Sequence, residues 1–395
     1  MADSTTGGTE PLGTDRIGHG GPTLGVEEEF LLADAVTRRP AAVAPAVVAE
    51  AQRLAGPGHV VAEMSRAQVE TVSAVCADAA QLRAELQRLR SCAARAAREH
   101  GCVLVASGTA PLGEAGPPPV TDKPRYHRIA DRYGALIHGM CANACHVHIG
   151  VPDVDEAVQV VNHLRPWTPL LLALTANSPY CQGRDTGHAS WRTMLWDRWP
   201  TAAPPPYLRS AAHYRQLTEA LVDSGAALDT GMVYWGVRPS RHVPTIEVRV
   251  ADVMPGVEET VAFAALVRAL VSAAVAEVRR GRRAVPVEDA VLRAALWRSA
   301  REGLQGQVLA LPATAAPRLV PARHLADALA GLLDEQLTAT GDDRRVRGWL
   351  RYLGEQGTGA ARQRAAFHTA RRLEDAVDAL AVPVAHSPWE DTAVG

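Results

Sequence analysis

The acidic triplet Glu27-Glu28-Glu29 lies inside an apolar stretch, GVEEEFLL. An extended strand points alternate side chains to opposite faces, so Glu27 and Glu29 share one face and Glu28 takes the other. Two carboxylates on one face repel each other unless a cation lies between them. Oxygen ligands of this kind suit Mg²⁺, in particular Mg²⁺ carried on nucleotide phosphates. A solvent-exposed acidic edge is the alternative, but the flanking Val26 and Phe30 argue against it.

A second strand signal, Ala142–Gly150, contains two histidines. Alternation places His146 and His148 on one face of this strand and Cys145 on the other. Two histidines so placed could ligate a metal ion, and a buried, hydrogen-bonded histidine pair is the alternative. The nearby thiol of Cys141 suggests zinc. Cys145 points away from the histidines, however, and the spacing matches no common zinc-finger pattern.

A third strand signal, Thr245–Val250, alternates cleanly between apolar and polar residues. Its apolar side chains would face the core, and Glu247 and Arg249 would line the other face. An ordinary surface strand with an ion pair is one interpretation. The other is a metal-binding carboxylate beside a guanidinium, whose planar fork suits phosphate oxygens.

Two further segments carry weaker signals. Glu63 and Glu70 flank part of Val60–Val72, which we expect to be extended, and taken alone they indicate only a charged surface segment. In Gly183–Gly187, GRDTG, the glycines would let backbone amides approach an anion, and Arg184 could clamp a carboxylate or phosphate. The sequence has no Walker A motif, no GxGxxG and no convincing Ser-His-Asp signature.

The elements that must position these residues mix strands and helices without strict alternation, which predicts an α+β fold with a mostly antiparallel sheet. Strands are expected at residues 23–33, 60–72, 102–107, 142–150, 232–238 and 244–250. Helices are expected at 40–54, 78–100, 126–138 and 152–174, and from Val257 onwards with breaks near Gly281 and Pro312–Pro321. The tryptophan-rich loop Ser178–Tyr207 would either close over a site or pack as an outer core.

Composition limits the remaining choices. The chain has 395 residues, 47% of them hydrophobic, and a formal net charge of −2, so no global field draws it to nucleic acid or to an anionic membrane. We find no apolar run that approaches the roughly 20 residues needed to span a bilayer. Residues 1–21 lack the apolar core of a signal peptide and are expected to be a disordered leader. The 6 scattered cysteines predict reduced thiols in the cytoplasm.

In this order, the motifs resemble those of the YbdK-type carboxylate–amine ligases of the glutamate–cysteine ligase family. The matching segments are GVEEEF at 25–30, the Glu63…Gln68-x-Glu70 stretch, HVHIG at 146–150, SPYCQGRDTG at 178–187 and TIEVR at 245–249. They span Leu24 to Val250, and the overall length suggests that the resemblance covers nearly the whole chain. The resemblance implies a glutamine-synthetase-like fold, in which an antiparallel sheet carries metal ligands on its concave face and helices pack against it.

The resemblance also assigns roles to residues. It implies a magnesium shell of Glu27, Glu29, Glu63, Glu70, His148 and Glu247. Arg249 would hold the transferred phosphoryl group, and Glu27 is the metal ligand on which we expect turnover to depend. His146 and Arg184 would lie nearby, on substrate or nucleotide. Glu63 and the choice of His148 over His146 have the least sequence support.

The implied function is an ATP- and Mg²⁺-dependent ligase that joins a glutamate-like carboxylate to an amine such as cysteine, which would give γ-glutamylcysteine. ATP would convert the unreactive carboxylate into an acyl phosphate, which the amine attacks. The alternatives are a guanidino kinase-type phosphotransferase, a metal-dependent amide hydrolase and an ATP-binding sensor without turnover.

The resemblance and composition together suggest the organisation of the chain. We expect a leader at 1–21, one catalytic domain at 22–385 with a helical part at 257–385, and a tail at 386–395. The expected partners are small-molecule substrates, with no nucleic acid and no membrane. A homodimer is compatible with the sequence, although no motif specifies it.

Overall fold

A computed structural model describes residues 21–113, 116–311 and 317–382. The predicted leader, apart from Gly21, and the predicted tail therefore lie outside the described residues, and so does part of the predicted break at Pro312–Pro321.

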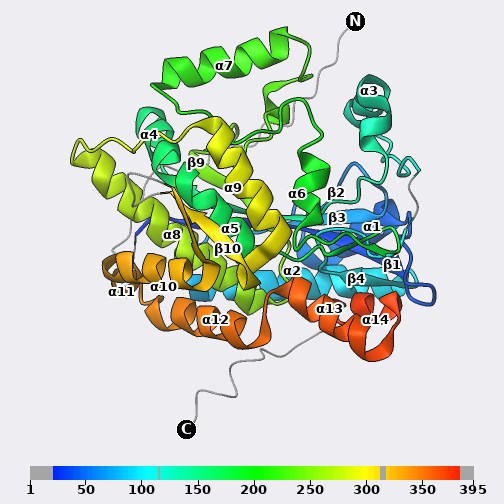
Figure 1. Cartoon of the computed structure of the whole chain (residues 1–395). Coiled ribbons are helices and arrows are strands. Elements are labelled where there is room, and N and C mark those ends of the chain that lie inside the picture. Colours follow the sequence, from blue (N-terminus) through cyan, green and yellow to red (C-terminus); the bar gives the residue numbers. More distant parts are fainter. Residues whose placement is uncertain (1–20, 114–115, 312–316, 383–395) are drawn as a thin grey trace, which may run out of the picture.

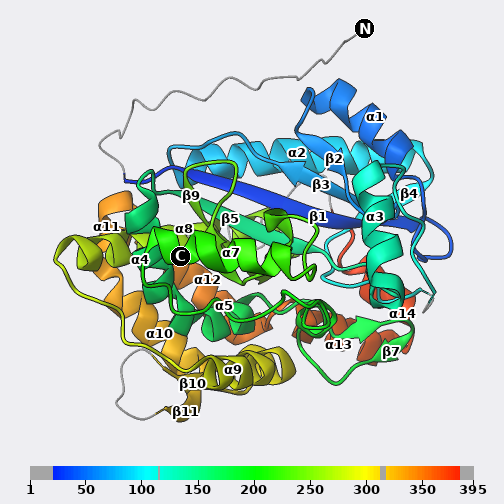
Figure 2. The same cartoon turned by 90° about the horizontal axis from the view of Figure 1, so that it is seen from above.

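A seven-stranded sheet lies at the centre of the described fold, with the order β2-β3-β1-β5-β9-β8 and β4 pairing the end of β1. The strands are β1 (Leu24–Asp34), β2 (Val60–Ala62), β3 (Gln68–Val72), β4 (Cys102–Val105), β5 (Ala144–Gly150), β8 (Val237–Pro239) and β9 (Thr245–Asp252). Every pairing in it is antiparallel. Figure 2 shows β1 running through the middle of the molecule. The predicted fold class is confirmed.

Helices cover the apolar face of this sheet. They include α1 (Ala44–Ala55), α2 (Ala79–Glu99), α4 (Val154–Leu164), α5 (Thr168–Thr175) and α8 (Val257–Arg279). The side chain of Asp78 accepts a hydrogen bond from the backbone N–H of Gln81 at 2.8 Å, which confirms the predicted start of α2. Leu82, Leu86 and Leu89, spaced at helical intervals, are fully buried beneath the sheet.

Helix α8 corrects one expectation from the sequence. By length and composition alone it could cross a membrane, although no run of that kind was expected. In the fold, 67% of its apolar stretch is buried inside the protein, where it contacts α2, α4 and β5. An apolar composition on most sides is what a central core helix requires.

The remaining elements flank this centre. They are α3 (Pro124–Tyr133), α6 (Trp191–Trp196), α7 (Ala211–Asp223), α9 (Asp289–Glu302), α10 (Ala322–Leu332), α11 (Asp334–Thr340), α12 (Asp343–Gln356), α13 (Gly359–Ala370) and α14 (Leu373–Asp378), with small hairpins β6 (Tyr180–Cys181)–β7 (Arg184–Asp185) and β10 (Gln307–Ala310)–β11 (Arg318–Pro321). In Figure 1, α10 to α14 gather at one side of the molecule, and α3 and α7 lie at the other.

Several predicted boundaries were wrong for local reasons. The helix expected at 152–174 is interrupted by a 3-10 turn at Arg165–Trp167, because Pro166 has no N–H to continue the α-helical pattern. The extended segment expected at 60–72 is the β2–β3 hairpin. The strand expected at 232–238 begins only at Val237. The helical C-terminal third also contains the unexpected hairpin β10–β11.

Candidate active site

The pairing of the strands brings acidic residues from separate segments together. On one side of β1, Glu29 lies opposite Glu70 of β3, and on the other side Glu27 lies opposite His146 of β5. Farther along β5, His148 lies opposite Glu247 of β9. Residues directly opposite each other in antiparallel strands point to the same face. A row of carboxylates and imidazoles therefore runs across four strands, on the face turned away from α2 and α8.

A cavity of about 280 Å³ opens on this face. Its lining includes most of the predicted site residues, namely Glu27, Glu29, Glu63, Glu70, His146 and Arg249. Three overlapping groups have ligand atoms within 4.8 Å of one another: Glu27, Glu70 and His146; Glu27, His148 and Glu247; and Glu29, Glu63 and Glu70. Glu27 and Glu70 each belong to two groups, so the three groups form one continuous row of oxygen and nitrogen ligands.

The carboxylates of Glu29 and Glu70, at the β3 end of this row of ligands, are not fully compensated by positive charge nearby. Burial, and then the neighbouring Glu63, raise the pKa of Glu29 to about 7. Burial, Glu63, Glu27 and Glu29 together raise the pKa of Glu70 well above its ordinary value. Such shifts mean that ionising these groups is unfavourable until a positive charge is placed among them.

Glu27 is in the opposite state. Burial would raise its pKa, but the hydrogen bond with His146 and the proximity of His148 outweigh burial and hold the pKa of Glu27 well below the ordinary value. The Nδ1 atom of His146 lies 3.1 Å from a carboxylate oxygen of Glu27. Burial and the charge of Arg249 lower the pKa of His146 to about 4, so its imidazole is neutral at pH 7.

The two histidines are held differently. Nδ1 of His148 lies 2.9 Å from the hydroxyl of Thr245. Its Nε2 is buried, has no hydrogen-bond partner among the described residues and lies 3.6 Å from a Glu27 oxygen. A ring fixed at one nitrogen with the other left free is the arrangement of a metal-ligating histidine. The geometry thus favours His148 over His146 as a ligand, although the site assignments stay predictions.

Arg249 lies beside these ligands. Its guanidinium pairs with Glu247, and Nε of Arg238 donates to the other oxygen of Glu247 at 2.7 Å. Burial raises the pKa of Glu247, but Arg249 and Arg238 outweigh it and keep that pKa low. Burial opposes the charge on Arg249, yet Glu247 keeps its pKa above the ordinary value. Arg249 is therefore a permanent, half-buried cation in the cavity wall.

An irregularity in the pairing of β5 with β9 determines which way the side chain of Arg249 points. The β5–β9 register shifts between Cys145 and Val147, so both Arg249 and Val250 lie opposite His146. A bulge of this kind adds one residue to a strand and changes which side chains face the site. Strict alternation along Thr245–Val250 was predicted, and the bulge that interrupts it at Arg249 and Val250 has no clear sequence signal.

The tryptophan-rich loop forms one wall of the cavity. The buried carboxylate of Asp252 accepts hydrogen bonds from the hydroxyls of Ser178 at 2.6 Å and Ser190 at 2.9 Å. These bonds attach the first part of the loop, from Ser178 to Ser190, to β9. Helix α6 follows and places Trp196 against Tyr234, with ring centroids 4.7 Å apart. These rings pack as an outer core and also line the cavity, whereas closure of the loop over a substrate stays a prediction.

Arg184 lies apart from this assembly. It is exposed on β7 and does not line the cavity, so its predicted role on substrate or nucleotide remains a prediction. Sequence reasoning missed several lining residues, among them Arg125, Tyr126 and Arg238. Of these three, only Arg238 could have been expected from the sequence, because a basic residue in the strand next to Glu247 favours a cross-strand ion pair.

The sequence matches the profile of glutamate–cysteine ligase family 2 over residues 23–379. A candidate glutamate–cysteine ligase 2-1 of Saccharopolyspora erythraea is 48% identical over 360 residues, which is 91% of this chain and 94% of the relative. A candidate glutamate–cysteine ligase 2 of Salinispora tropica is 47% identical over 358 residues, 90% of this chain and 92% of the relative.

Solved structures share the fold at low identity. Glutamate–cysteine ligase of Francisella tularensis, in complex with AMP, superposes with a TM-score of 0.70 at 12% identity, covering 91% of this chain and 88% of that one. A bifunctional glutathione synthetase of Pasteurella multocida gives a TM-score of 0.60 at 15% identity, covering 92% of this chain and 51% of that one. Together with the relatives, these likenesses confirm the predicted fold and the predicted ATP-dependent carbon–nitrogen ligase. This chain belongs to glutamate–cysteine ligase family 2.

Proposed function

We propose that this chain joins a glutamate-like carboxylate to a small amine, cysteine among them, using ATP and Mg²⁺. The observation that carries the proposal is the row of ligands across four strands that ends beside the half-buried cation of Arg249. The names of the relatives support glutamate and cysteine as substrates. The carboxylates on the face of the sheet turned away from α2 and α8 support Mg²⁺ as the metal.

The residues present fit Mg²⁺. Carboxylate oxygens are its preferred protein ligands, and the crowded carboxylates of Glu29 and Glu70 require a positive charge to ionise. Glu27, His148 and Glu247 would hold one ion, and Glu29, Glu63 and Glu70 another. Bound there, Mg²⁺ would neutralise charge on the nucleotide phosphates and on the oxygens that gain charge during transfer.

The chain's own residues would position two successive transfers. First, a substrate carboxylate oxygen bonds to the γ-phosphorus of ATP as the bond to ADP breaks. Then the amine nitrogen bonds to the acyl carbon, phosphate leaves and the nitrogen loses a proton. Arg249 would hold the transferred phosphoryl group with donors fixed in place beforehand. The rings of Trp196 and Tyr234 would keep water from the acyl phosphate.

The test is release of ADP by the purified chain with Mg²⁺, glutamate and a panel of amines, read together with product mass. We expect amine-dependent ADP release, an equal amount of phosphate and an amide product. A phosphorylated product without amide would instead identify a guanidino kinase-type phosphotransferase. ATP binding that no carboxylate and amine pair converts into turnover would identify a sensor.

We also propose that the enzyme works in the cytoplasm. All of its 6 cysteines are free thiols in the structure, as a reducing compartment requires. Mass spectrometry of the protein from its native cells, with thiols blocked at lysis, should find them reduced. A stable disulfide in that material would contradict the location.

A further inference from the structure

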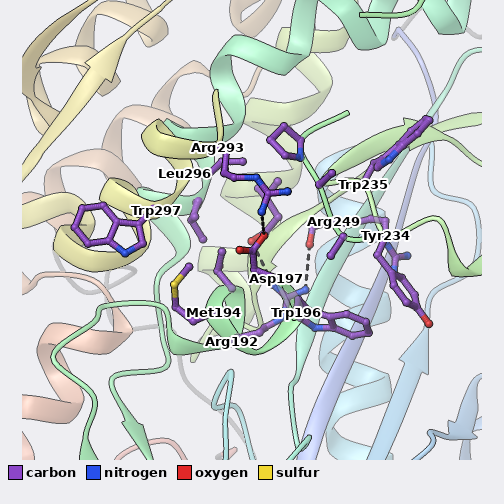
Figure 3. A pocket seen from close by; sticks show the side chains of 17 residues that line it. Arg192, Met194, Trp196, Asp197, Tyr234, Trp235, Arg249, Arg293, Leu296 and Trp297 are labelled. Atoms are coloured by element: carbon purple, nitrogen blue, oxygen red, sulfur yellow. Dashed lines mark hydrogen bonds and ion pairs between the residues drawn. The ribbon is translucent and has the colours of Figure 1, made fainter. Parts of the chain in front are cut away.

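A second cavity adjoins the carboxylate site at the edge of β9. Its volume is about 130 Å³, and Trp196, Tyr234 and Arg249 line both cavities. Figure 3 shows these three side chains at one side of the cavity and Trp297 at the other. A molecule in this cavity would therefore lie next to the residue that we expect to hold the phosphoryl group.

The wall of this second cavity is largely apolar. Leu172, Leu296 and Trp235 contribute to it, together with Trp297 of α9, whose side chain is 51% exposed. A large exposed aromatic side chain at an apolar cavity is typical of a ligand-binding groove. Two further lining residues, Arg293 and Asp197, form an ion pair at 2.9 Å, and both side chains are substantially exposed.

Two buried polar atoms of the lining residues lack a partner among the described residues, Nε of Arg192 and Nε1 of Trp196. The guanidinium of Arg192 donates to the backbone carbonyls of Arg249 at 3.1 Å and Val250 at 3.3 Å, and its side chain is almost fully buried. Its Nε has no hydrogen-bond partner among the described residues. Neither donor atom is exposed to the cavity, so the size and the apolar surface of the cavity select its occupant.

Size decides between the candidate occupants. An engineered cavity of about 150 Å³ holds one benzene molecule, so about 130 Å³ suits a single six-membered ring or a branched aliphatic group. The short side chain of cysteine would leave most of this space empty. Adenine joined to ribose would exceed it.

We propose that this cavity receives the side chain of the amine substrate, so that the preferred acceptor carries a ring-sized or branched apolar group. This inference rests on the proposed ligase function. With its side chain here, an acceptor would have its nitrogen beside Arg249, where the acyl phosphate is expected. The bond changes stay those of amide formation: nitrogen bonds to the acyl carbon, phosphate departs and one proton is released.

The first test compares acceptors in the ADP-release assay with ATP, Mg²⁺ and glutamate. Because one or two apolar groups in a fitted pocket change kcat/KM by about 10-fold or more, leucine or phenylalanine should exceed alanine and cysteine by at least that factor. The variant Ala203→Phe fills the cavity from its wall, and Ala203→Ser is the matched control. Ala203→Phe should lose the advantage of the larger acceptors, with the KM for ATP unchanged.

Either of two results with Ala203→Phe would overturn the inference. A raised KM for ATP with every acceptor in Ala203→Phe would show that the cavity holds nucleotide. An undiminished preference for phenylalanine would show that the cavity is not used. If Ala203→Phe does not fold, Leu296→Ala enlarges the same cavity and should shift the preference toward bulkier acceptors. No shift in a folded Leu296→Ala would equally overturn the inference.

A binding measurement separates this inference from the ligase function. Calorimetric titration with phenylalanine, in the presence of glutamate and a non-hydrolysable ATP analogue, should give saturable heat with the unmodified chain and with Ala203→Ser. It should give none with Ala203→Phe. Such binding without amine-dependent turnover would support the cavity assignment and contradict the ligase, whereas absence of binding to the unmodified chain would contradict the cavity assignment.

Discussion

Neighbouring glutamates of β1 have opposite surroundings on the two faces of the sheet. Glu28 is fully buried against α2, where Arg90 donates to both of its oxygens at 2.9 and 2.5 Å and the hydroxyl of Thr260 donates at 2.7 Å. Glu27 and Glu29 point the other way, into a cavity shared with the carboxylates before and within β3. One face satisfies its buried charge within the chain, whereas the other leaves the carboxylates of Glu29 and Glu70 crowded together.

The comparison distinguishes a structural charge from a functional one. A buried ion pair stabilises little on balance, but breaking it is costly because one charge is left uncompensated. The carboxylates of the cavity carry a related cost in the folded state, visible as the raised pKa values of Glu29 and Glu70. We infer that the protein tolerates this cost because a bound cation removes it during function.

The largest expected effect comes from Glu27→Gln. The amide keeps the shape of the side chain but removes a ligand that belongs to two of the three groups. Because a bound metal stabilises transferring oxygens by several kcal/mol, ADP release should fall about 1000-fold. The circular dichroism spectrum should stay that of the folded chain. Near-normal turnover by a folded variant would remove Glu27 from the metal site.

The same substitution one residue along, Glu28→Gln, should act on stability instead. It leaves the guanidinium of Arg90, 3% exposed, without its anion. The free energy of unfolding should fall by about 3 kcal/mol, measured by urea denaturation, while kcat per folded molecule stays unchanged. If Glu28→Gln abolished turnover in fully folded protein, the two faces would not be functionally distinct.

Arg249→Lys tests the cation that completes the functional face. An ammonium keeps the charge but cannot reproduce the planar fork. Loss of one preorganised transition-state donor costs about 100-fold in kcat, so kcat should fall by that factor with little change in melting temperature. Retention of normal kcat would place the phosphoryl group elsewhere.

The smallest expected effect is a pH dependence confined to the metal-free protein. Burial and Glu63 raise the pKa of Glu29 from 4.5 to about 7. A raised folded pKa stabilises the fold at low pH, and that contribution disappears as pH rises through the folded value. With EDTA present, the melting temperature should therefore fall between pH 5 and pH 8, and saturating Mg²⁺ should reverse the fall.

Glu70→Gln supplies the control for this pH series. Removing a carboxyl whose pKa is also raised should flatten the decline in melting temperature and stabilise the EDTA-treated protein at pH 8. The same variant should lose activity. An unchanged decline in Glu70→Gln would mean that carboxylate crowding is not its cause.

Much of the site could be predicted from the sequence because its ligands lie on strands with simple alternation. In β5 and β9 the polar residues recur at every second position, and in β1 the alternation of faces separates Glu27 and Glu29 from Glu28. The faces of Glu27, His148 and Glu247 therefore followed from the period of an extended chain. The resemblance supplied the connection between these distant segments, which periodicity within one strand cannot give.

The rest depended on tertiary contacts that leave no local pattern. Nothing around Arg90 indicates that it would pair with Glu28, 62 residues away along the chain. The approach of Trp196 to Tyr234 depends on the carboxylate of Asp252, which holds a loop from a different part of the chain. The second cavity could not be foreseen for the same reason, since its wall combines α5, α6, β9 and α9.

The central claim is that the open face of the sheet is a divalent-cation site, and binding of Mn²⁺ in place of Mg²⁺ tests it most directly. Electron paramagnetic resonance would count free Mn²⁺ as it is titrated into the chain with ATP. We predict saturable binding that Mg²⁺ displaces, unchanged in Glu28→Gln and strongly weakened in Glu27→Gln. Equal binding by the unmodified chain and Glu27→Gln, or none by either beyond that of ATP alone, would contradict the claim.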